Sequence, residues 1–220
     1  MLKIDIIPFN FVKVNTYILK APSGNCVIVD PGCLGESEES YLSKYLSENS
    51  LTPVGLWLTH QHFDHVFGVS YVERKYGLKA LCMRGDESWQ TLNVQECEKF
   101  RCYMSGDVEM NFTYSIGRYV EEGEELVLDD YRFRALHVPG HSQGSMVLYC
   151  EAEKVCIAGD VLFQMSIGRS DFPGGNERQL IENIRAKMLT LPDDTVVLPG
   201  HGSSTTIEIE RKANPFLVRL

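Results

Sequence analysis

The residues of this chain best suited to chemistry are its histidines, three of which fall in the segment HQHFDH at 60–65 although the sequence holds six in all. His60 and His62 are two residues apart, so both side chains of an extended segment can leave on the same side. We expect Asp64 and His65 to diverge from them as the chain turns into a helix. This arrangement can present two ligands to one metal ion and two to a neighbouring ion, as two-metal hydrolases require. Imidazole and carboxylate ligands without thiolate suit zinc, iron or manganese.

Two metal ions need more ligands than one cluster supplies, and three further candidates follow apolar runs that are predicted strands. His141 lies in VPGHS, Asp160 in AGD, and His201 in LPGHG. A glycine precedes each of them and lets the backbone turn at the end of the strand. Each is a weak signal alone, but together with the histidine cluster they are a strong signal of a metal-ligand set. His137 lies on a predicted strand, and we interpret it as structural.

The elements that must position these residues follow from hydrophobic patterning, in which short β-branched runs alternate with helical periods. This predicts one α/β domain over residues 1–220. The predicted strands are 4–7, 12–19, 26–29, 54–58, 126–128, 131–137, 146–150, 155–158 and 195–198. The first three should form an antiparallel meander. Helices are predicted around 41–46, over 69–76 with a stop at Gly77, and after N-caps at Asn176 and Thr205.

The stretch from about residue 86 to residue 118 keeps neither a helical nor a strand period throughout. It carries several aromatic residues, among them Trp89 and Tyr114. One interpretation is a packed helical connection. The other is a cover over an active site, since long irregular insertions in compact domains are often lids.

Composition excludes several classes of protein. With 44% hydrophobic and 23% charged residues among 220, the chain has the composition of a folded globular protein. A net charge of −9 argues against a nucleic-acid partner. No apolar run approaches the length of a membrane span, and the start MLKIDIIPFNF does not resemble an export signal. The seven cysteines include no C-x-x-C pair, which indicates reduced thiols. We therefore expect a cytoplasmic enzyme without a membrane partner.

The order of the candidate ligands resembles the metallo-β-lactamase superfamily, whose pattern is an early aspartate, then H-x-H-x-D-H, then a distant histidine, aspartate and histidine. Asp30, in VIVDPG, matches the first element. The resemblance spans nearly the whole chain and implies an αβ/βα four-layer sandwich of two mixed sheets with helices on the outer faces. It implies that His60, His62 and His141 hold one divalent ion, that Asp64, His65 and His201 hold the other, and that Asp160 bridges them. Asp30 would orient the cluster by hydrogen bonding to a ligand imidazole.

Within the superfamily, the chain resembles compact members similar to glyoxalase II, a hydroxyacylglutathione hydrolase. DVLF at 160–163, followed by Gly168 and Arg169, is similar to the segment in which these thiolester hydrolases carry a basic substrate-binding residue. The resemblance therefore implies that Arg169 anchors a substrate carboxylate. Glyoxalase II places a tyrosine two residues later, where this chain has Asp171. Compact members are also similar in GRSDFPGG and in a closing NPFL.

The activity implied is hydrolysis of a small-molecule thioester or related ester by a hydroxide bound between two metal ions, with zinc expected and iron or manganese as alternatives. Asp64 is the expected catalytic residue, because it could orient the hydroxide and shuttle its proton. One alternative is an oxidoreductase with a single iron, resembling persulfide dioxygenases. Another is a metal-binding scaffold without catalysis. Metal content distinguishes these interpretations.

Overall fold

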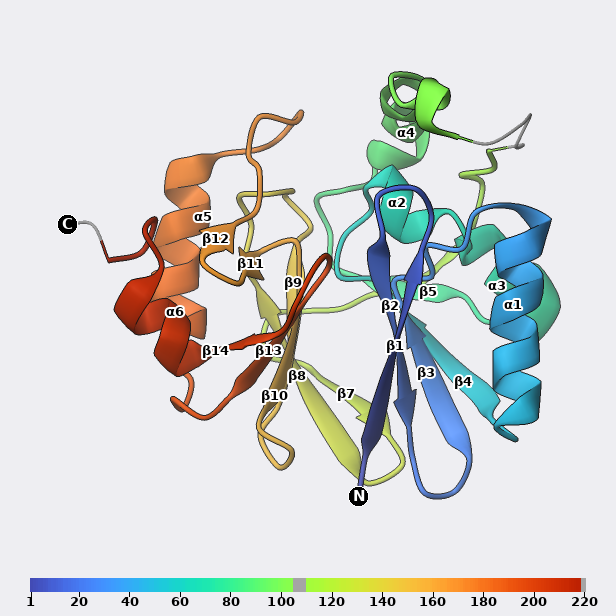
Figure 1. Cartoon of the computed structure of the whole chain (residues 1–220), viewed down its shortest axis with the longest axis horizontal. Helices are drawn as coiled ribbons and strands as arrows, with labels where there is room; N and C mark the ends of the chain where they lie inside the picture. The colour runs from blue at the N-terminus through green and yellow to red at the C-terminus, as the bar shows by residue number, and fades with distance from the viewer. Residues whose placement is uncertain (105–109, 219–220) are drawn as a thin grey trace. The chain divides into compact units, whose positions relative to one another are not determined.

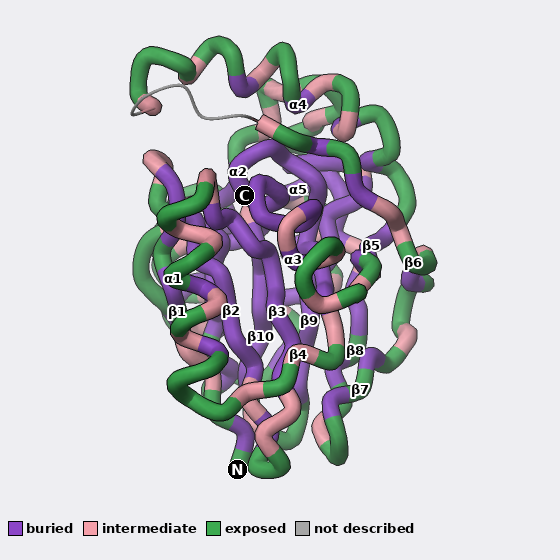
Figure 2. Tube along the Cα trace, turned by 90° about the vertical axis from the view of Figure 1, so that its right-hand side faces the viewer, coloured by how far each residue is buried: buried purple, intermediate pink, exposed green. Residues whose placement is uncertain are grey.

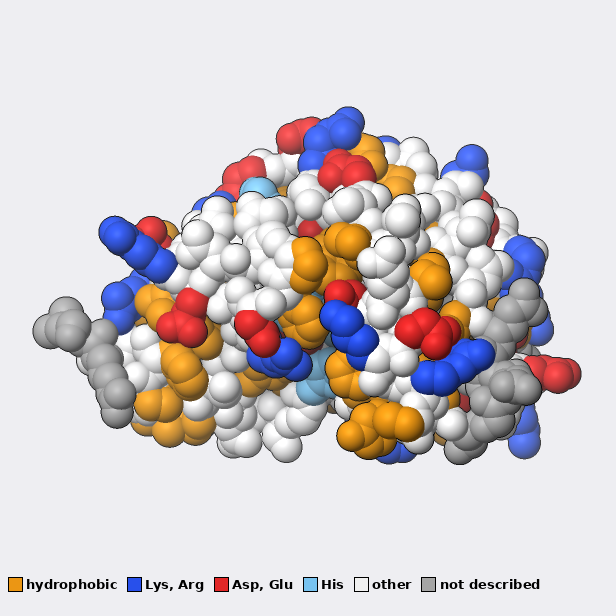
Figure 3. Space-filling view, turned by 90° about the horizontal axis from the view of Figure 1, so that it is seen from above, with side chains coloured by type: hydrophobic (Ala, Val, Ile, Leu, Met, Phe, Trp, Pro, Cys, Tyr) orange, Lys and Arg blue, Asp and Glu red, His pale blue; other side chains and the backbone are white. Residues whose placement is uncertain are grey.

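The computed structural model describes residues 1–104 and 110–218, and the chain divides into two compact units (Figure 1). The first unit comprises Met1–Cys82 and Glu87–Tyr119, and the second comprises Met83–Asp86 and Val120–Leu220. Each unit contains one six-stranded sheet. Among the described residues, no helix has both the length and the apolar character needed to cross a membrane. On the face shown in Figure 3, acidic and basic side chains are interspersed.

The first unit is built on a mixed sheet with the strand order β1-β2-β3-β4-β5-β6. Its strands are β1 Lys3–Phe9, β2 Val14–Lys20, β3 Asn25–Val29, β4 Thr52–Trp57, β5 Ala80–Cys82 and β6 Ile116–Tyr119. The first three pair antiparallel, which confirms the predicted meander, and the pairings from β3 to β6 are parallel. Because β3 and β4 are parallel neighbours, the segments that follow them leave the same edge of the sheet.

Helices lie over one face and beyond one end of this sheet (Figure 1). They are α1 Gly35–Glu48, α2 Phe63–Val66, α3 Val69–Tyr76 and α4 Trp89–Glu98, with a 3-10 turn, η1, at Arg101–Tyr103. Leu42 and Leu46 of α1 and Val69 and Val72 of α3 join strand residues such as Ile28 in one hydrophobic cluster. Figure 2 shows the central strands buried and the outer turns of α1 exposed. The buried residues of α1 and α3 therefore face the sheet, whereas Tyr41, also within the predicted helix around 41–46, is 55% exposed.

Gly77 ends α3 as predicted. Its φ of 70° lies in the left-handed region, and its backbone N–H donates to the carbonyl oxygen of Glu73. Glycine adopts this conformation without the steric cost that a Cβ would impose. Leu78 and Lys79 then lead into β5.

The second unit contains a mixed sheet with the order β14-β13-β10-β9-β8-β7. Its strands are β7 Glu125–Leu128, β8 Tyr131–His137, β9 Met146–Cys150, β10 Val155–Gly159, β13 Val196–Pro199 and β14 Thr205–Thr206. Only the pairing of β10 with β13 is parallel among these strands as described. A separate small hairpin joins β11 Leu162–Phe163 to β12 Ser166–Ile167, and the helical segments are α5 Glu177–Asn183, the π-helical η2 Ile184–Met188 and α6 Ile207–Ala213. Both sheets are thus mixed and carry helices, which confirms the predicted α/β class.

One of the two predicted helix caps in this unit is confirmed and the other is wrong. The Asn176 side chain accepts a hydrogen bond of 3.0 Å from the backbone N–H of Gln179, as expected. The last helix is capped by Thr206, whose Oγ1 accepts from Ile209 N at 3.3 Å, and not by Thr205. Thr205 still pairs with Val197 in the sheet, so the helix starts one residue later than predicted.

The segment from residue 86 to residue 118 contains α4, η1 and the edge strand β6, and its residues 105–109 lie outside the described residues. Neither β5 nor β6 was predicted. Their three and four residues are too few to show an alternating pattern. Both strands form through pairing with residues distant in sequence.

Candidate metal centre

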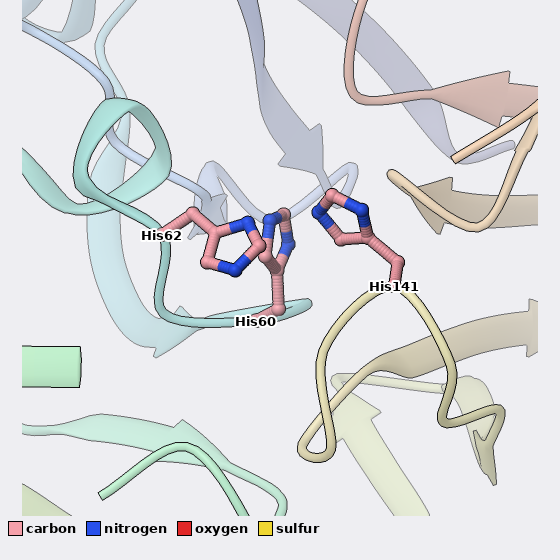
Figure 4. A group of neighbouring side chains, drawn as sticks. All are labelled: His60, His62 and His141. Carbon is pink, nitrogen blue, oxygen red and sulfur yellow. The ribbon is translucent and has the colours of Figure 1, made fainter. Parts of the chain in front are cut away.

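The predicted metal ligands fall into two groups, one in each unit. His60, His62, Asp64 and His65 lie on the loop after β4 and on α2, in the first unit. The other three follow strands of the second unit: His141 after β8, Asp160 after β10 and His201 after β13. Figure 4 draws His60 and His62 on the loop after β4 and His141 on the loop that joins β8 to β9.

The first group is buried and its imidazoles converge. His60, His62, Asp64 and His65 are each at most 8% exposed. The ring centroid of His60 is 4.6 Å from that of His62 and 4.1 Å from that of His65. Buried ionisable groups are unfavourable unless they pair with one another or bind a cation. The hydrogen bonds of these side chains therefore indicate which of their atoms can bind a cation.

Asp30, at the end of β3, organises the group through its carboxylate. Its Oδ1 accepts a hydrogen bond from Thr59 N at 2.7 Å, and its Oδ2 accepts from Thr59 Oγ1 at 2.6 Å. Oδ2 also lies 2.9 Å from Nδ1 of His65. Because a carboxylate only accepts, His65 carries its proton on Nδ1, and Nε2 of the neutral ring keeps its lone pair.

Thr59 extends the same control to His60. The single hydroxyl proton of Thr59 is donated to Asp30, so the contact of 3.1 Å between Thr59 Oγ1 and His60 Nδ1 is donated by the imidazole. His60 thereby also keeps a lone pair on Nε2. Candidate ligand atoms of Asp30, His60 and His65 lie within 4.8 Å of one another. Sequence reasoning missed Thr59, because no local pattern marks a threonine as a hydrogen-bond partner of Asp30 and His60.

The irregular segment after residue 86 contacts this ligand loop. The backbone oxygen of Gln61 accepts from Asn93 Nδ2 at 2.8 Å, and its side-chain Oε1 accepts from Tyr114 Oη at 3.0 Å. The ring of Trp89 packs edge to face on His62, with centroids 4.1 Å apart. The described part of the segment is therefore packed against the loop that carries the ligands.

In the second group, strand topology brings two ligands together. β10 and β13 are parallel neighbours, so their carboxyl ends meet at one edge, where Gly200 N donates to Gly159 O at 2.8 Å. Asp160 and His201 follow directly. Oδ2 of Asp160 is 3.7 Å from Nε2 of His201 and 3.7 Å from Nε2 of His141.

The hydrogen bond made by Nδ1 of His141 indicates how its Nε2 atom interacts with Asp160. Its Nδ1 lies 2.6 Å from the carbonyl oxygen of Arg169, which can only accept, so Nε2 of the neutral ring keeps its lone pair facing Asp160. In the first unit, His65 Nε2 faces Asp64 Oδ2 in the same way at 3.6 Å. Two acceptors form no hydrogen bond with each other. Their spacing is close to the separation of about 3.4 Å between two ligands of one tetrahedral zinc. Both pairs therefore fit a shared cation.

Two side chains outside the predicted ligand set hold the His141 loop. Asp86 is fully buried, and its carboxylate accepts from Ser142 Oγ and from Gly144 N, both at 2.8 Å. His137 Nε2 contacts the carbonyl oxygen of Gln143 at 2.7 Å, a contact of the kind expected for a structural histidine. The sequence offered no signal for Asp86, because its partners lie more than fifty residues further along the chain.

The hairpin β11–β12 closes back onto Asp160. A Cβ added at Gly168 would overlap the carbonyl oxygen of Asp160, so only glycine fits there. The fully buried Glu210 of α6 anchors the hairpin, since its carboxylate accepts from Met165 N at 3.0 Å and from Asn214 Nδ2 at 2.7 Å. The closing NPFL motif thus contributes Asn214 to the support of this hairpin.

Arg169, the predicted substrate anchor, is already ion-paired. Its Nε and Nη2 donate to Oδ1 and Oδ2 of Asp171 at 3.0 and 2.8 Å. This pairing raises the pKa of Arg169 and lowers the pKa of Asp171, so both groups are charged at neutral pH. The guanidinium also lies over the ring of Phe172, 4.6 Å from its centroid.

Comparison with known proteins identifies the family. The model of the metallo-beta-lactamase superfamily matches residues 10–201. This chain belongs to the metallo-beta-lactamase superfamily. Hydroxyacylglutathione hydrolase GloC of Haemophilus influenzae is a superfamily relative, 36% identical over 98% of this chain and 98% of its own length.

Two crystal structures show the superfamily fold of this chain. The B3 metallo-beta-lactamase BLEG-1 matches with a TM-score of 0.85 at 33% identity, over 99% of this chain and 100% of that one. TTHA1623 in a di-iron-bound form matches with a TM-score of 0.83 at 30% identity, over 97% and 100%. The chain is accordingly a member of a superfamily of metal-dependent hydrolases, and its clusters of histidine and aspartate are of the kind that binds divalent metals.

Proposed function

We propose that this protein hydrolyses thioesters or related esters with two divalent metal ions. The observation that carries the proposal is the pairing of His65 with Asp64 and of His141 with Asp160, in which an imidazole nitrogen faces a carboxylate oxygen at 3.6 to 3.7 Å, once in each unit, while the other ring nitrogen is hydrogen-bonded to an acceptor. The thioester class is supported by the similarity to GloC, which is named as a hydroxyacylglutathione hydrolase.

The proposed ligand set follows the resemblance to the superfamily. One ion would be held by His60, His62 and His141, the other by Asp64, His65 and His201, with Asp160 shared between them. Zinc suits this set, and iron is an alternative because the similar TTHA1623 is described in a di-iron-bound form. When bound, such ions supply Lewis acidity and lower the pKa of a coordinated water to about 7.

The chain's own groups would then act on protons and on orientation. Asp30 and Thr59 keep protons on Nδ1 of His65 and His60, so both Nε2 atoms stay available as ligands. Asp64, 3.6 Å from His65 Nε2, is the proposed acceptor for the proton of the attacking water. The main chain of Arg169 holds His141 in the equivalent way.

The proposal is tested by metal content and turnover in matched variants. Asp160→Asn removes a ligand charge, whereas Asp194→Asn changes an exposed aspartate paired with Lys154. We expect two metal equivalents in the wild type, loss of bound metal in Asp160→Asn only, and a fall in thioester hydrolysis of about 100-fold or more. Elemental analysis and a screen of thioester, lactone and phosphoester substrates give both readouts.

Two results would overturn this function. The first is a metal-replete protein that hydrolyses neither thioesters nor esters. The second is one iron per chain with consumption of oxygen, which would replace the hydrolase with an oxidoreductase. Full metal retention by Asp160→Asn would remove the bridging role from that residue.

A further inference from the structure

The loop after β12 contains three residues, Arg169, Asp171 and Phe172, whose side chains are in contact through that of Arg169. Arg169 donates from Nε and Nη2 to both carboxylate oxygens of Asp171, and its guanidinium lies over the ring of Phe172. The Nε–Nη2 edge of the guanidinium, one of the two edges that can hold a carboxylate in two parallel hydrogen bonds, is thereby occupied. One of its faces is covered as well.

This loop adjoins a proposed metal ligand. The carbonyl oxygen of Arg169 is 2.6 Å from His141 Nδ1, and the ring of Phe172 stands edge to face with that of His141 at 6.1 Å. The side chains of Arg169 and Asp171 are 63% and 68% exposed. A substrate group that approaches His141 within this unit therefore meets a cation and an anion that neutralise each other.

The neutral pair changes what the loop can recognise. A guanidinium alone attracts an anionic substrate and can hold its carboxylate in a bidentate geometry. Here an incoming carboxylate must either displace Asp171 or bind at the Nη1–Nη2 edge, and in both cases it stays close to the negative charge of Asp171. Specific proteins use such like-charge contacts to reject the wrong ligand. Because the ion pair is exposed, the penalty corresponds to a modest factor in affinity.

We propose that Asp171 is a specificity-determining residue that disfavours anionic substrates, so that the substrates of this protein are thioesters or esters uncharged at the group that reaches Arg169. The reaction named here rests on the proposed function. The preference between charged and neutral ligands does not, because it can be measured by binding alone.

The test compares two thioesters that are identical except that one carries a carboxylate and the other the corresponding amide. We expect the wild type to favour the amide and Asp171→Asn to raise the acid-to-amide ratio of kcat/KM by about two- to fivefold. Adding Arg169→Gln to that variant should remove the gain, since the freed guanidinium is its source. Asp194→Asn, an exposed aspartate paired with Lys154, should leave the ratio unchanged.

The same comparison can be made without turnover. Each thioester is replaced by the corresponding thioether, which cannot be hydrolysed, and the equilibrium affinities of the acid and the amide are measured. The proposal is overturned if Asp171→Asn leaves the acid-to-amide ratio unchanged, or if the gain persists without Arg169. Should the metal-replete wild type cleave neither thioester while the thioether affinities shift as expected, the hydrolase function fails and the role of Asp171 stands.

Discussion

Nδ1 of His65 and Oδ2 of Asp30 lie 2.9 Å apart, and both side chains are fully buried or nearly so. The same oxygen accepts from Thr59 Oγ1, which in turn contacts His60. One carboxylate on the end of β3 therefore fixes the proton positions of two imidazoles on the loop after β4.

Asp30→Asn should weaken metal binding by about 10- to 100-fold, the usual effect of losing a group that orients ligand imidazoles. The amide nitrogen would face donors where the carboxylate accepts from them. Equilibrium dialysis with zinc measures the change, and Asp194→Asn serves as an exposed control. An unchanged affinity in Asp30→Asn would show that the His65 ring is oriented by other contacts.

Thr59→Val should lower the free energy of unfolding of the metal-free protein by about 1–2 kcal/mol, because it removes a buried hydroxyl that bonds Asp30 and His60. Thr59→Ser keeps the hydroxyl and should lose far less. Urea denaturation of both variants gives the comparison. Equal destabilisation by valine and serine would assign the effect to packing and not to the hydrogen bonds.

Glu210→Gln should destabilise the protein by about 1–3 kcal/mol. The buried carboxylate accepts from Met165 N and Asn214 Nδ2, and an amide would turn a donor toward these donors. Glu208→Gln, on the same helix but exposed and paired with Lys212, should cost about 0.5 kcal/mol or less. Thermal and urea unfolding measure both, and similar values for the two variants would contradict the anchoring role of Glu210.

Stability should fall in alkaline solution because of the buried thiols. Burial raises the pKa of Cys97 from 9.0 to about 12, and that of Cys26 likewise to about 12. The native thiols therefore hold their protons over a range in which the unfolded thiols ionise. The free energy of unfolding is therefore unaffected by the ionisation of these thiols below about pH 9. Between about pH 9 and about pH 12 it falls by about 1.4 kcal/mol per pH unit for each thiol.

Urea unfolding between about pH 8 and about pH 11 tests this alkaline loss. Cys97→Ala removes one of the thiols, so its stability should decline less steeply with pH than that of the wild type, whatever the offset between the two curves. Parallel curves would show that Cys97 does not take part in the alkaline transition.

Where signals are local, the sequence was sufficient to predict much of this structure. The spacing of Val69, Val72 and Tyr76 indicated α3, and the following Gly77 indicated its end. Both the helical period and the terminating glycine lie within one short stretch of sequence. Asn176 was recognisable as a cap for the same reason. At Thr205 the local pattern was ambiguous, since either of two adjacent threonines can cap, and pairing with β13 decided between them.

The residues that support the candidate site were beyond sequence reasoning because their partners are remote or their environment is atypical. Asp86 reaches Ser142 across more than fifty residues. Glu210 sits among charged residues in IEIERKA and would be taken for an exposed position, yet it is fully buried. The pairing of Arg169 with Asp171 is local, but a sequence does not show whether a surface arginine is already engaged.

The main chain and the side chain of Arg169 have different roles. Its main chain holds an imidazole, while its side chain points to solvent beside Asp171. Any amino acid with an unaltered backbone there keeps the carbonyl oxygen that contacts the imidazole, so the side chain at this position can change without loss of that hydrogen bond. We therefore expect that the side chains at positions 169 and 171 can be changed to alter substrate preference while the backbone contact to His141 is kept.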